Sequence, residues 1–402
     1  MVSTVTSYTD SRNRAYPGGG YDGVVRISSG SHYGTGVLLY DGRAVLTTAH
    51  LFASASASAS IYFETSAGGQ TVASSRISLS PVYDSAQGNN DLALVWLSSA
   101  APATAERYQL YRSSDEVGQT LTMVGYGLPG TGAAGALTSY SGSPVRLKAD
   151  NQFDADAGTL KGALGAVMGW SPTAGTQLFA DFDNGTTNQD ALGQLINRPG
   201  TGLGQSEGLV ASGDSGGPAF VNGRIAGIAS YTAALSSGAI NPDIDSIANS
   251  SFGELAAWQR VSHYQQWIDQ ALRVQYPNAP TRAADVQTRV TEGHSGTTFA
   301  YFLLQFTGVR SDPSQQLSVD YVTRDGSAKA GLDYLPVTGK LVLYPDETQA
   351  VIPVEVVGDT AAESDETFYL EVSNPVGGSF GEGVLTLTAM RTIVNDDGLW
   401  LA

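Results

Sequence analysis

SGDSGGPAF, residues 212–220, places one serine, Ser215, between Gly213 and the pair Gly216–Gly217. Glycine allows a sharp backbone turn and a close approach by a substrate, so Ser215 is a candidate nucleophile. An ordinary glycine turn would have the same composition. Residues elsewhere in the chain decide between these two interpretations.

Two further stretches supply the partners that a serine nucleophile requires. His50 follows an apolar run in VLTTAHLF (45–52), and Asp91 opens another in DLALVWL (91–97). A serine hydroxyl becomes nucleophilic when a general base takes its proton, and the imidazole needs a carboxylate that fixes its tautomer. The sequence therefore predicts a catalytic triad of Ser215, His50 and Asp91.

The composition limits the other functions that the chain can have. Its 402 residues include 48 Gly and no Cys, with 21 Lys and Arg against 38 Asp and Glu. Without Cys there are no disulfides, thiol nucleophiles or Cys-ligated metals. The net charge of −17 disfavours a nucleic-acid partner, because that binding depends on Lys and Arg. No apolar run reaches the roughly 18 residues of a membrane-spanning helix, so we expect no membrane span.

Short apolar segments separated by Gly, Asp and Asn recur along the chain and predict an all-β protein. One long helix is predicted over 253–273, where apolar residues recur at spacings of three and four. The stretch ASASASAS (53–60) is a permissive strand or loop. DFDNGTTNQD (181–190) hints at a calcium loop, but its spacing does not fit the EF-hand pattern, so a plain turn is favoured.

The chain resembles the chymotrypsin-type (trypsin-like) serine proteases in the segments TTAH, DLAL and GDSGGP and in the order of the three triad residues, over roughly 20–275. The resemblance implies a double β-barrel with a C-terminal helix and an acyl-enzyme mechanism. Ser215 would attack the carbonyl, His50 would act as base and then as acid, and Asp91 would orient His50. The backbone N–H groups of Gly213 and Ser215 would form the oxyanion hole.

The same resemblance implies roles for two more residues and shows two departures. Asp214 matches the carboxylate that receives a new N-terminus after zymogen cleavage, and Ser230 matches the serine that hydrogen-bonds the triad aspartate. The disulfides that brace the serine loop in this family are absent, so other packing must hold the oxyanion hole. Much of 142–206 looks like an insertion beyond the usual length of the family.

The primary specificity pocket is also implied by the resemblance. Its base falls on Leu209, which cannot pair a buried Arg or Lys, so we expect cleavage after small or medium apolar residues. Glu207 lies close in sequence and would complicate this preference. The predicted substrate-binding residues are Leu209, Val210, Ser230, Tyr231 and Thr232.

Residues 285–397 alternate apolar and polar side chains over several strands, as in an antiparallel sandwich. Acidic residues cluster at the turns and strand ends. Carboxylates packed at one end of a sandwich repel one another unless a hard cation such as calcium accepts their oxygens. A solvated acidic rim is the alternative interpretation.

This second region resembles a Calx-beta domain in TEGHSG, DGSAKAGLDY and ESDETFYLEVSNP and in the closing TIVNDDG. The resemblance implies an Ig-like sandwich. The positions that match the family's calcium ligands are Glu292, Asp333, Asp359, Glu363, Glu366, Asp396 and Asp397. Gly358 and Thr360 stand where fully liganded members carry further aspartates, which argues against additional ions.

The sequence therefore predicts a leader or propeptide-like segment (1–19), a trypsin-like domain (20–275), a linker (276–284) and a Calx-beta domain (285–402). Met1 would then begin a precursor with an activation site near Arg14–Ala15, unless this segment is only a flexible leader. We expect a secreted or cell-surface bacterial serine endopeptidase that binds calcium through its second domain and uses no cofactor for catalysis. Its partners would be a protein or peptide substrate and a cell surface or matrix. A catalytically silent adhesion protein and a triad esterase are the alternatives.

Overall fold

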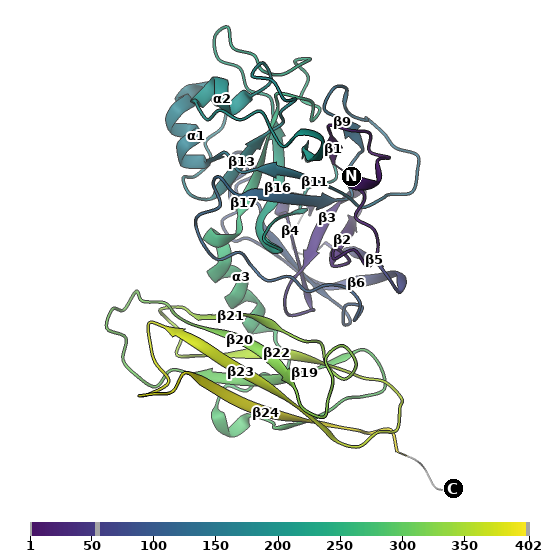
Figure 1. Ribbon diagram of the computed structural model, residues 1–402, viewed down its shortest axis with the longest axis vertical. Helices are drawn as coiled ribbons and strands as arrows, with labels where there is room; N and C mark the ends of the chain where they lie inside the picture. The colour runs from purple at the N-terminus through teal and green to yellow at the C-terminus, as the bar shows by residue number, and fades with distance from the viewer. Residues whose placement is uncertain (1, 53–56, 399–402) are drawn as a thin grey trace. The chain divides into compact units, whose positions relative to one another are not determined.

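The computed structural model describes residues 2–52 and 57–398, and the chain forms two compact units (Figure 1). The division falls between Gln265 and Gln266, earlier than the predicted linker at 276–284, and Tyr40–Gly42 belongs with the second unit. Part of the predicted strand or loop at 53–60, namely 53–56, lies outside the described residues.

The first half of the N-terminal unit is a closed barrel with the strand order β2-β3-β4-β7-β6-β5. Alternate side chains of these strands, such as Val25, Ile27, Val45 and Val95, fill the barrel core. The strands are β2 (Val24–Ser29), β3 (His32–Leu38), β4 (Ala44–Thr47), β5 (Ser60–Thr65), β6 (Gly68–Leu79) and β7 (Ala93–Leu97).

The second half of this unit is built on a seven-stranded sheet with the order β11-β8-β15-β16-β17-β13-β12. Trp258, Phe153 and Leu147 belong to its apolar core. Its strands are β8 (Thr120–Gly125), β11 (Leu147–Gln152), β12 (Ala155–Asp156), β13 (Gln177–Asp181), β15 (Pro218–Val221), β16 (Arg224–Ala233) and β17 (Leu255–Arg260). The helices α1 (Ala157–Leu164) and α2 (Ala191–Ile196) lie side by side next to it (Figure 1).

Two expectations for this region are corrected. The predicted helix over 253–273 is strand β17 followed by α3 (Val261–Gln275), because residues 255–260 are buried between β16 and β13. The predicted insertion at 142–206 contains β11 and β13, which pair with β8 and β17. The stretch therefore contributes strands to the sheet, and an insertion in its remaining segments, which include α1 and α2, stays a prediction.

The N-terminal segment also differs from the predicted leader. Val2, Ser3 and Thr4 are fully buried, and Val2 belongs to the core of the seven-stranded sheet. Strand β1 (Ser3–Thr4) lies between β14 (Gly208–Leu209) and β9 (Gly130–Thr131), and β10 (Gly135–Ala136) completes this four-stranded sheet. Residues 2–4 are thus built into the unit that carries the predicted serine loop.

The C-terminal unit is a sandwich of a five-stranded sheet, β18-β24-β23-β20-β21, and a two-stranded sheet, β19-β22. Phe302, Val354 and Phe368 lie in the core between the sheets. The strands are β18 (Arg289–Thr291), β19 (Thr297–Gln305), β20 (Leu317–Asp325), β21 (Thr338–Leu343), β22 (Gln349–Val357), β23 (Glu366–Val376) and β24 (Thr386–Val394). The predicted fold class, a mostly-strand N-terminal unit followed by a sandwich, is confirmed.

Among the described residues, no helix is both long enough and apolar enough to cross a membrane.

Candidate active site and candidate metal centre

His50 and Asp91 meet where β4 and β7 lie side by side. His50 sits on the short 3₁₀ turn Ala49–Leu51 that follows β4, and Asp91 stands just before β7; the two strands pair antiparallel with Thr47 opposite Ala93. The backbone N–H of His50 donates to Asp91 Oδ1 at 2.9 Å, and the atoms Nδ1 and Oδ2 are 2.6 Å apart. Because Nδ1 is held by the carboxylate, Nε2 is the ring nitrogen left for a proton transfer.

Asp91 receives a third hydrogen bond from β16, the strand that carries the predicted substrate-binding residues Ser230, Tyr231 and Thr232. Ser230 Oγ on β16 donates to Asp91 Oδ2 at 2.6 Å, as the resemblance implied. Asp91 is 2 % exposed, whereas the His50 side chain is 34 % exposed. A buried carboxylate held by three donors keeps the imidazole in one orientation.

The serine loop is held by Thr35 on β3 in place of a disulfide. Thr35 Oγ1 donates to the carbonyl of Gly213 at 3.0 Å, and its backbone N–H donates to the carbonyl of Ser215 at 2.8 Å. Thr35 Oγ1 also accepts the N–H of Tyr126 at 3.0 Å. Thr35 thus fixes the loop to the first barrel at both Gly213 and Ser215, and joins it to Tyr126, which follows β8.

Asp214 holds the same loop from inside. Its two carboxylate oxygens accept the N–H groups of Gly127 at 2.8 Å and of Ala211 at 2.9 Å. Burial raises the pKa of this carboxyl, and the two backbone donors oppose that effect. The predicted reception of an N-terminus stays a prediction.

The geometry around Ser215 leaves the expected donors available. Gly213 has φ +91°, and a side chain there would contact Tyr33 and Gly127. Within the described part of the chain, the N–H groups of Gly213 and Ser215 make no hydrogen bond, and none joins Ser215 to His50. Two free N–H groups in one turn fit an oxyanion hole, and nucleophile–base hydrogen bonds are often long before a substrate binds.

A cavity of about 440 Å³ opens beside Ser215. Its lining is mostly small or apolar, and none of the described residues around it is charged. The predicted residues Val210, Ser230, Tyr231 and Thr232 line it, together with Leu128, Leu137, Ala211, Ser212, Ala229, Asn249 and Ser250, among others.

Leu209 and Glu207 do not line this cavity. Leu209 is fully buried in the core of the second sheet, because successive residues of an extended segment point to opposite sides and its neighbour Val210 takes the cavity side. Glu207 is also buried, and its carboxylate accepts the N–H groups of Asp183 at 2.8 Å and of Leu203. The prediction that Leu209 forms the pocket base is therefore wrong, and the expected interference from Glu207 does not arise.

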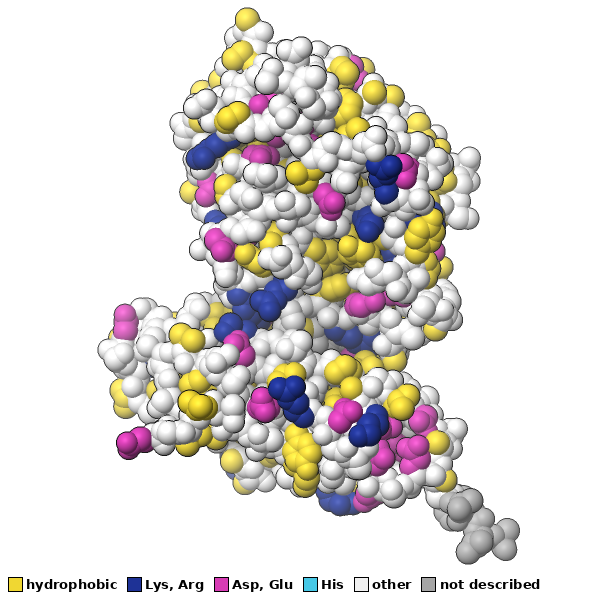
Figure 2. Space-filling view, viewed as in Figure 1, with side chains coloured by type: hydrophobic (Ala, Val, Ile, Leu, Met, Phe, Trp, Pro, Cys, Tyr) yellow, Lys and Arg dark blue, Asp and Glu magenta, His cyan; other side chains and the backbone are white. Residues whose placement is uncertain are grey.

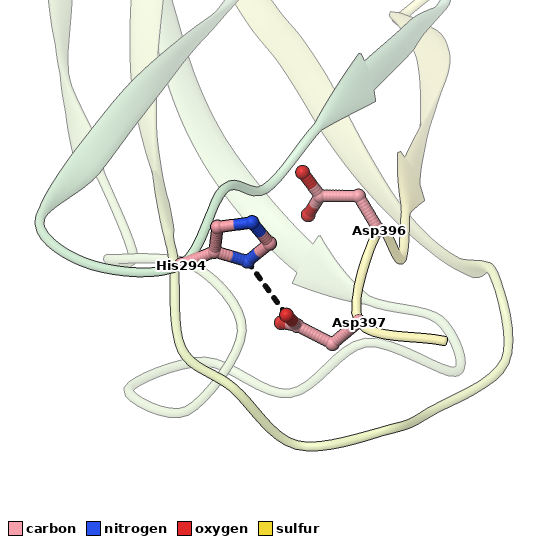
Figure 3. Close-up of side chains that lie close together, drawn as sticks. All are labelled: His294, Asp396 and Asp397. Carbon is pink, nitrogen blue, oxygen red and sulfur yellow. Dashed lines mark ion pairs between the residues drawn. The ribbon is translucent and has the colours of Figure 1, made fainter. Parts of the chain in front are cut away.

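The predicted calcium ligands gather at one end of the sandwich, where Figure 2 shows acidic side chains close together. The ligand atoms of Asp333, Glu363 and Glu366 lie within 4.8 Å of one another, as do those of Asp396, Asp397 and His294. Figure 3 shows the second group: His294 Nδ1 lies 2.6 Å from Asp397 Oδ1, with Asp396 beside them.

Glu292 connects the two groups. Burial, followed by the charges of Asp359, Glu363, Asp397 and Asp396, raises its pKa to about 7. Glu292 Oε1 and Asp397 Oδ2 are buried without a hydrogen-bond partner among the described residues. Carboxylate oxygens that are crowded, buried and unpaired fit a hard cation.

Gly358 lies where the backbone of two segments comes close together. A Cβ at this position would lie 2.5 Å from the carbonyl oxygen of Gly293 and 2.8 Å from that of Glu292. The backbone here approaches too closely for an aspartate side chain.

Comparison with known proteins assigns both units. Residues 10–154 match the family model of Trypsin, and residues 290–397 match that of the Calx-beta domain. The chain combines a trypsin-like domain with a Calx-beta domain. The Trypsin match includes His50 and Asp91 and ends before Ser215.

The Calx-beta domain is similar to parts of sodium/calcium exchangers. Human sodium/calcium exchanger 2 is 37% identical over 108 residues, which are 24% of this chain and 12% of the exchanger. Human exchanger 3 is 46% identical over 63 residues (16% and 7%), and the Drosophila melanogaster exchanger Calx is 36% identical over 91 residues (22% and 9%). The chain thus spans about a tenth of the length of these relatives.

A solved structure, the mouse serine protease neuropsin, is 17% identical. The match covers 65% of this chain and 98% of neuropsin, with a TM-score of 0.47.

Sequence reasoning missed several residues around both sites. In the trypsin-like domain, Gln259 Nε2 donates to Ser230 Oγ at 3.3 Å, and Trp170 Nε1 donates to the hydroxyl of Tyr231 at 2.8 Å. Trp170 and Tyr231 line a second cavity of about 420 Å³ beside His50. In the Calx-beta domain, His294 stands in the quoted TEGHSG, and its place next to Glu292 was the signal that could have revealed it.

Proposed function

We propose that the protein is a secreted serine endopeptidase that acts through Ser215, His50 and Asp91. The observation that carries the proposal is the hydrogen-bonded series Ser230–Asp91–His50, because Ser230 lines both the cavity beside Ser215 and the cavity beside His50. The Trypsin family match to 10–154 supports the same reaction class.

In this mechanism Ser215 Oγ forms a bond to the carbonyl carbon of the scissile peptide while its proton passes to His50 Nε2. The N–H groups of Gly213 and Ser215 stabilise the negative oxygen that develops. His50 then gives the proton to the departing amine, which breaks the C–N bond and leaves an acyl-enzyme. A water molecule, activated by His50 in the same way, releases the acid and restores the serine.

We further propose that cleavage follows small or medium apolar residues. The cavity beside Ser215 has no charged lining residue among those described, and Val210, Ala211 and Ala229 make part of its wall apolar. An Arg or Lys side chain there would lack a carboxylate partner, which is costly for a buried charge.

The Calx-beta domain is proposed to bind calcium and to offer a surface for cell-surface or matrix contact. Seven carboxylates at the predicted positions, two of them with buried unpaired oxygens, support the ion. The names of the exchangers that share this domain also mention calcium. Extracellular modules bind calcium at about 10⁻⁴ to 10⁻³ M, which is compatible with a secreted protein.

Hydrolysis of a small apolar peptide by wild type, Ser215→Ala and Ser99→Ala tests the proposed function. Ser99 is exposed and follows β7 at the end opposite to Asp91, so its variant controls for an unspecific serine effect. We expect full activity in Ser99→Ala and a loss of roughly a millionfold in kcat in Ser215→Ala. Ester turnover without peptide turnover would indicate the esterase, and no turnover of either would indicate a silent adhesion protein.

A further inference from the structure

We propose a second cation site, within the trypsin-like domain, in which Asp181, Asp183 and Asp190 bind calcium. The three side chains come from the end of β13, from the segment that follows it, and from the residue that caps α2. This is the segment for which the sequence favoured a plain turn. The proposal is independent of the catalytic assignment and of the ion proposed for the Calx-beta domain.

The three carboxylates are close together and almost fully buried. One oxygen of each lies within 4.8 Å of the others, and the residues are 2 %, 6 % and 3 % exposed. Calcium binds oxygen at about 2.3–2.6 Å, so two ligands on opposite sides of the ion are separated by about 4.6–5.2 Å. Three oxygens no farther apart than this can all bind one calcium ion.

Backbone N–H groups of the segment donate hydrogen bonds to two of the three aspartates, so these two have partners without a bound ion. Asp181 Oδ2 accepts the N–H of Leu192 at 2.7 Å, and Asp190 accepts from Gly193 at 2.6 Å and from Gly200 at 3.2 Å. Asp183 differs from them. Its Oδ1 is buried and has no hydrogen-bond partner among the described residues, which leaves a buried carboxylate oxygen unsatisfied.

The surroundings of Asp183 add negative charge. Glu207, 1 % exposed, and Asp154 lie close enough to act on its charge, as do Asp181 and Asp190. None of these five carboxylates forms an ion pair with Lys, Arg or His in the described part of the chain.

Such a group must hold protons or hold a cation. Carboxylate and backbone oxygens are ligands that suit hard cations. Among these, calcium tolerates the irregular geometry of a loop better than magnesium does. Gly202, with φ +85°, lets the backbone pass directly against Glu207 and Asp183. Glu207 immediately precedes β14 and the cavity residue Val210, so a bound ion would brace this wall of the substrate pocket.

The test is calcium binding to the full chain after treatment with a chelator and dialysis, measured by titration calorimetry for wild type, Asp183→Asn and Asp115→Asn. Asp115 is exposed and belongs to the same domain, so its variant removes one charge without touching the group. We expect Asp183→Asn to bind one calcium ion fewer than wild type, and Asp115→Asn to bind the same number. The Calx-beta domain is identical in all three chains and cancels in the comparison.

Thermal melts provide the second measurement and detect a folding defect. In chelator, Asp183→Asn should melt no lower than wild type, because the substitution removes a buried charge. A hundredfold excess of calcium over Kd should raise the melting temperature of the trypsin-like domain by about 5–10 °C in wild type and Asp115→Asn, and not in Asp183→Asn. Equal calcium stoichiometry and affinity in wild type and Asp183→Asn would overturn the site in favour of shared protons. So would a trypsin-like transition that millimolar calcium leaves unchanged.

Discussion

Asp91 uses both of its carboxylate oxygens, and this determines what His50 can do. One oxygen accepts the backbone N–H of His50, and the other lies 2.6 Å from both His50 Nδ1 and Ser230 Oγ. The ring is therefore fixed by its backbone and its side chain together. Side-chain chemistry of this kind requires particular residue types, which is why the triad could be predicted from sequence.

The individual residues that line the substrate pocket could be predicted less well than the triad. Counting six residues back from Ser215 gave Leu209, but adjacent residues of an extended segment face opposite sides. Only the paired strands show that Leu209 faces the core and that Val210 lines the cavity. Asn249 and Ser250, which lie more than 30 residues after Ser215 in the chain, close the cavity without any local sequence signal.

A peptide-library profile tests the pocket. Wild type should cleave after small or medium apolar residues, because the described lining residues carry no charge. Val210→Asp should increase cleavage after Arg or Lys relative to wild type, since it adds a carboxylate to the wall. A wild-type profile dominated by Arg or Lys would contradict the proposed preference.

Glu254 gives a pH-dependent prediction. It is fully buried behind the cavity wall, where Oε1 accepts the N–H groups of Asn249 at 2.8 Å and Ser251 at 3.0 Å, and burial raises its pKa. The folded state then keeps a proton that the unfolded state loses above about pH 4.3, so the free energy of unfolding falls as the pH rises towards the raised pKa. In Glu254→Gln the free energy of unfolding does not fall with pH for this reason, because the side chain cannot ionise.

Melting of the trypsin-like domain at pH 5, 6, 7 and 8 measures the effect. The melting temperature of Glu254→Gln relative to wild type should increase with pH, because every other carboxyl is common to both chains. Parallel curves would show that Glu254 ionises as freely in the folded state as in the unfolded one.

At the scale of elements, the boundary between β17 and α3 shows the limit of periodicity. Leu255, Trp258 and Val261 have the spacing of a helix face, but the strand is buried on both sides, so any apolar spacing suits it. A short, fully buried strand cannot be separated from a helix by its pattern alone. Strands such as β20 and β23 were predictable, because their residues alternate between buried and more exposed positions.

Thr35 connects an element of the first barrel to the serine loop and predicts a catalytic effect outside the triad. Thr35→Val removes the hydroxyl that binds the carbonyl of Gly213 and the N–H of Tyr126. We expect kcat to fall about tenfold to a hundredfold with little change in KM, because the oxyanion donors lose their exact position. Thr35→Ser keeps the hydroxyl and should keep the activity; wild-type kcat in Thr35→Val would remove Thr35 from this role.

For the whole molecule, the order of the two domains could be predicted because each carries its own sequence motifs. The extent of the first domain could not, since β11 and β13 lie in a stretch without recognisable motifs. The contribution of residues 2–4 to the core depends on pairing with β14, more than 200 positions away in the chain. Long-range pairing of this kind leaves no local pattern.

The separation of roles between the domains gives a prediction for the calcium ligands. The double variant Asp396→Asn/Asp397→Asn should lose the calcium-dependent rise in the melting temperature of the Calx-beta domain, about 2.7 kcal/mol of stabilisation at a hundredfold excess over Kd. Hydrolysis of a small peptide should stay within twofold of wild type (roughly 0.4 kcal/mol), because the triad contains no metal ligand. An unchanged calcium effect in the double variant would favour a solvated acidic rim.

Labelling with a fluorophosphonate tests the central claim most directly, because such a reagent requires an activated serine and reports the modified residue. The structure predicts one adduct per chain, located on Ser215 by peptide mass spectrometry. The adduct should be absent in Ser215→Ala and strongly slowed in His50→Ala, where the general base is missing. A chain that folds normally and takes up no label, or takes it up at another serine, would contradict the assignment of Ser215, His50 and Asp91 as a working triad.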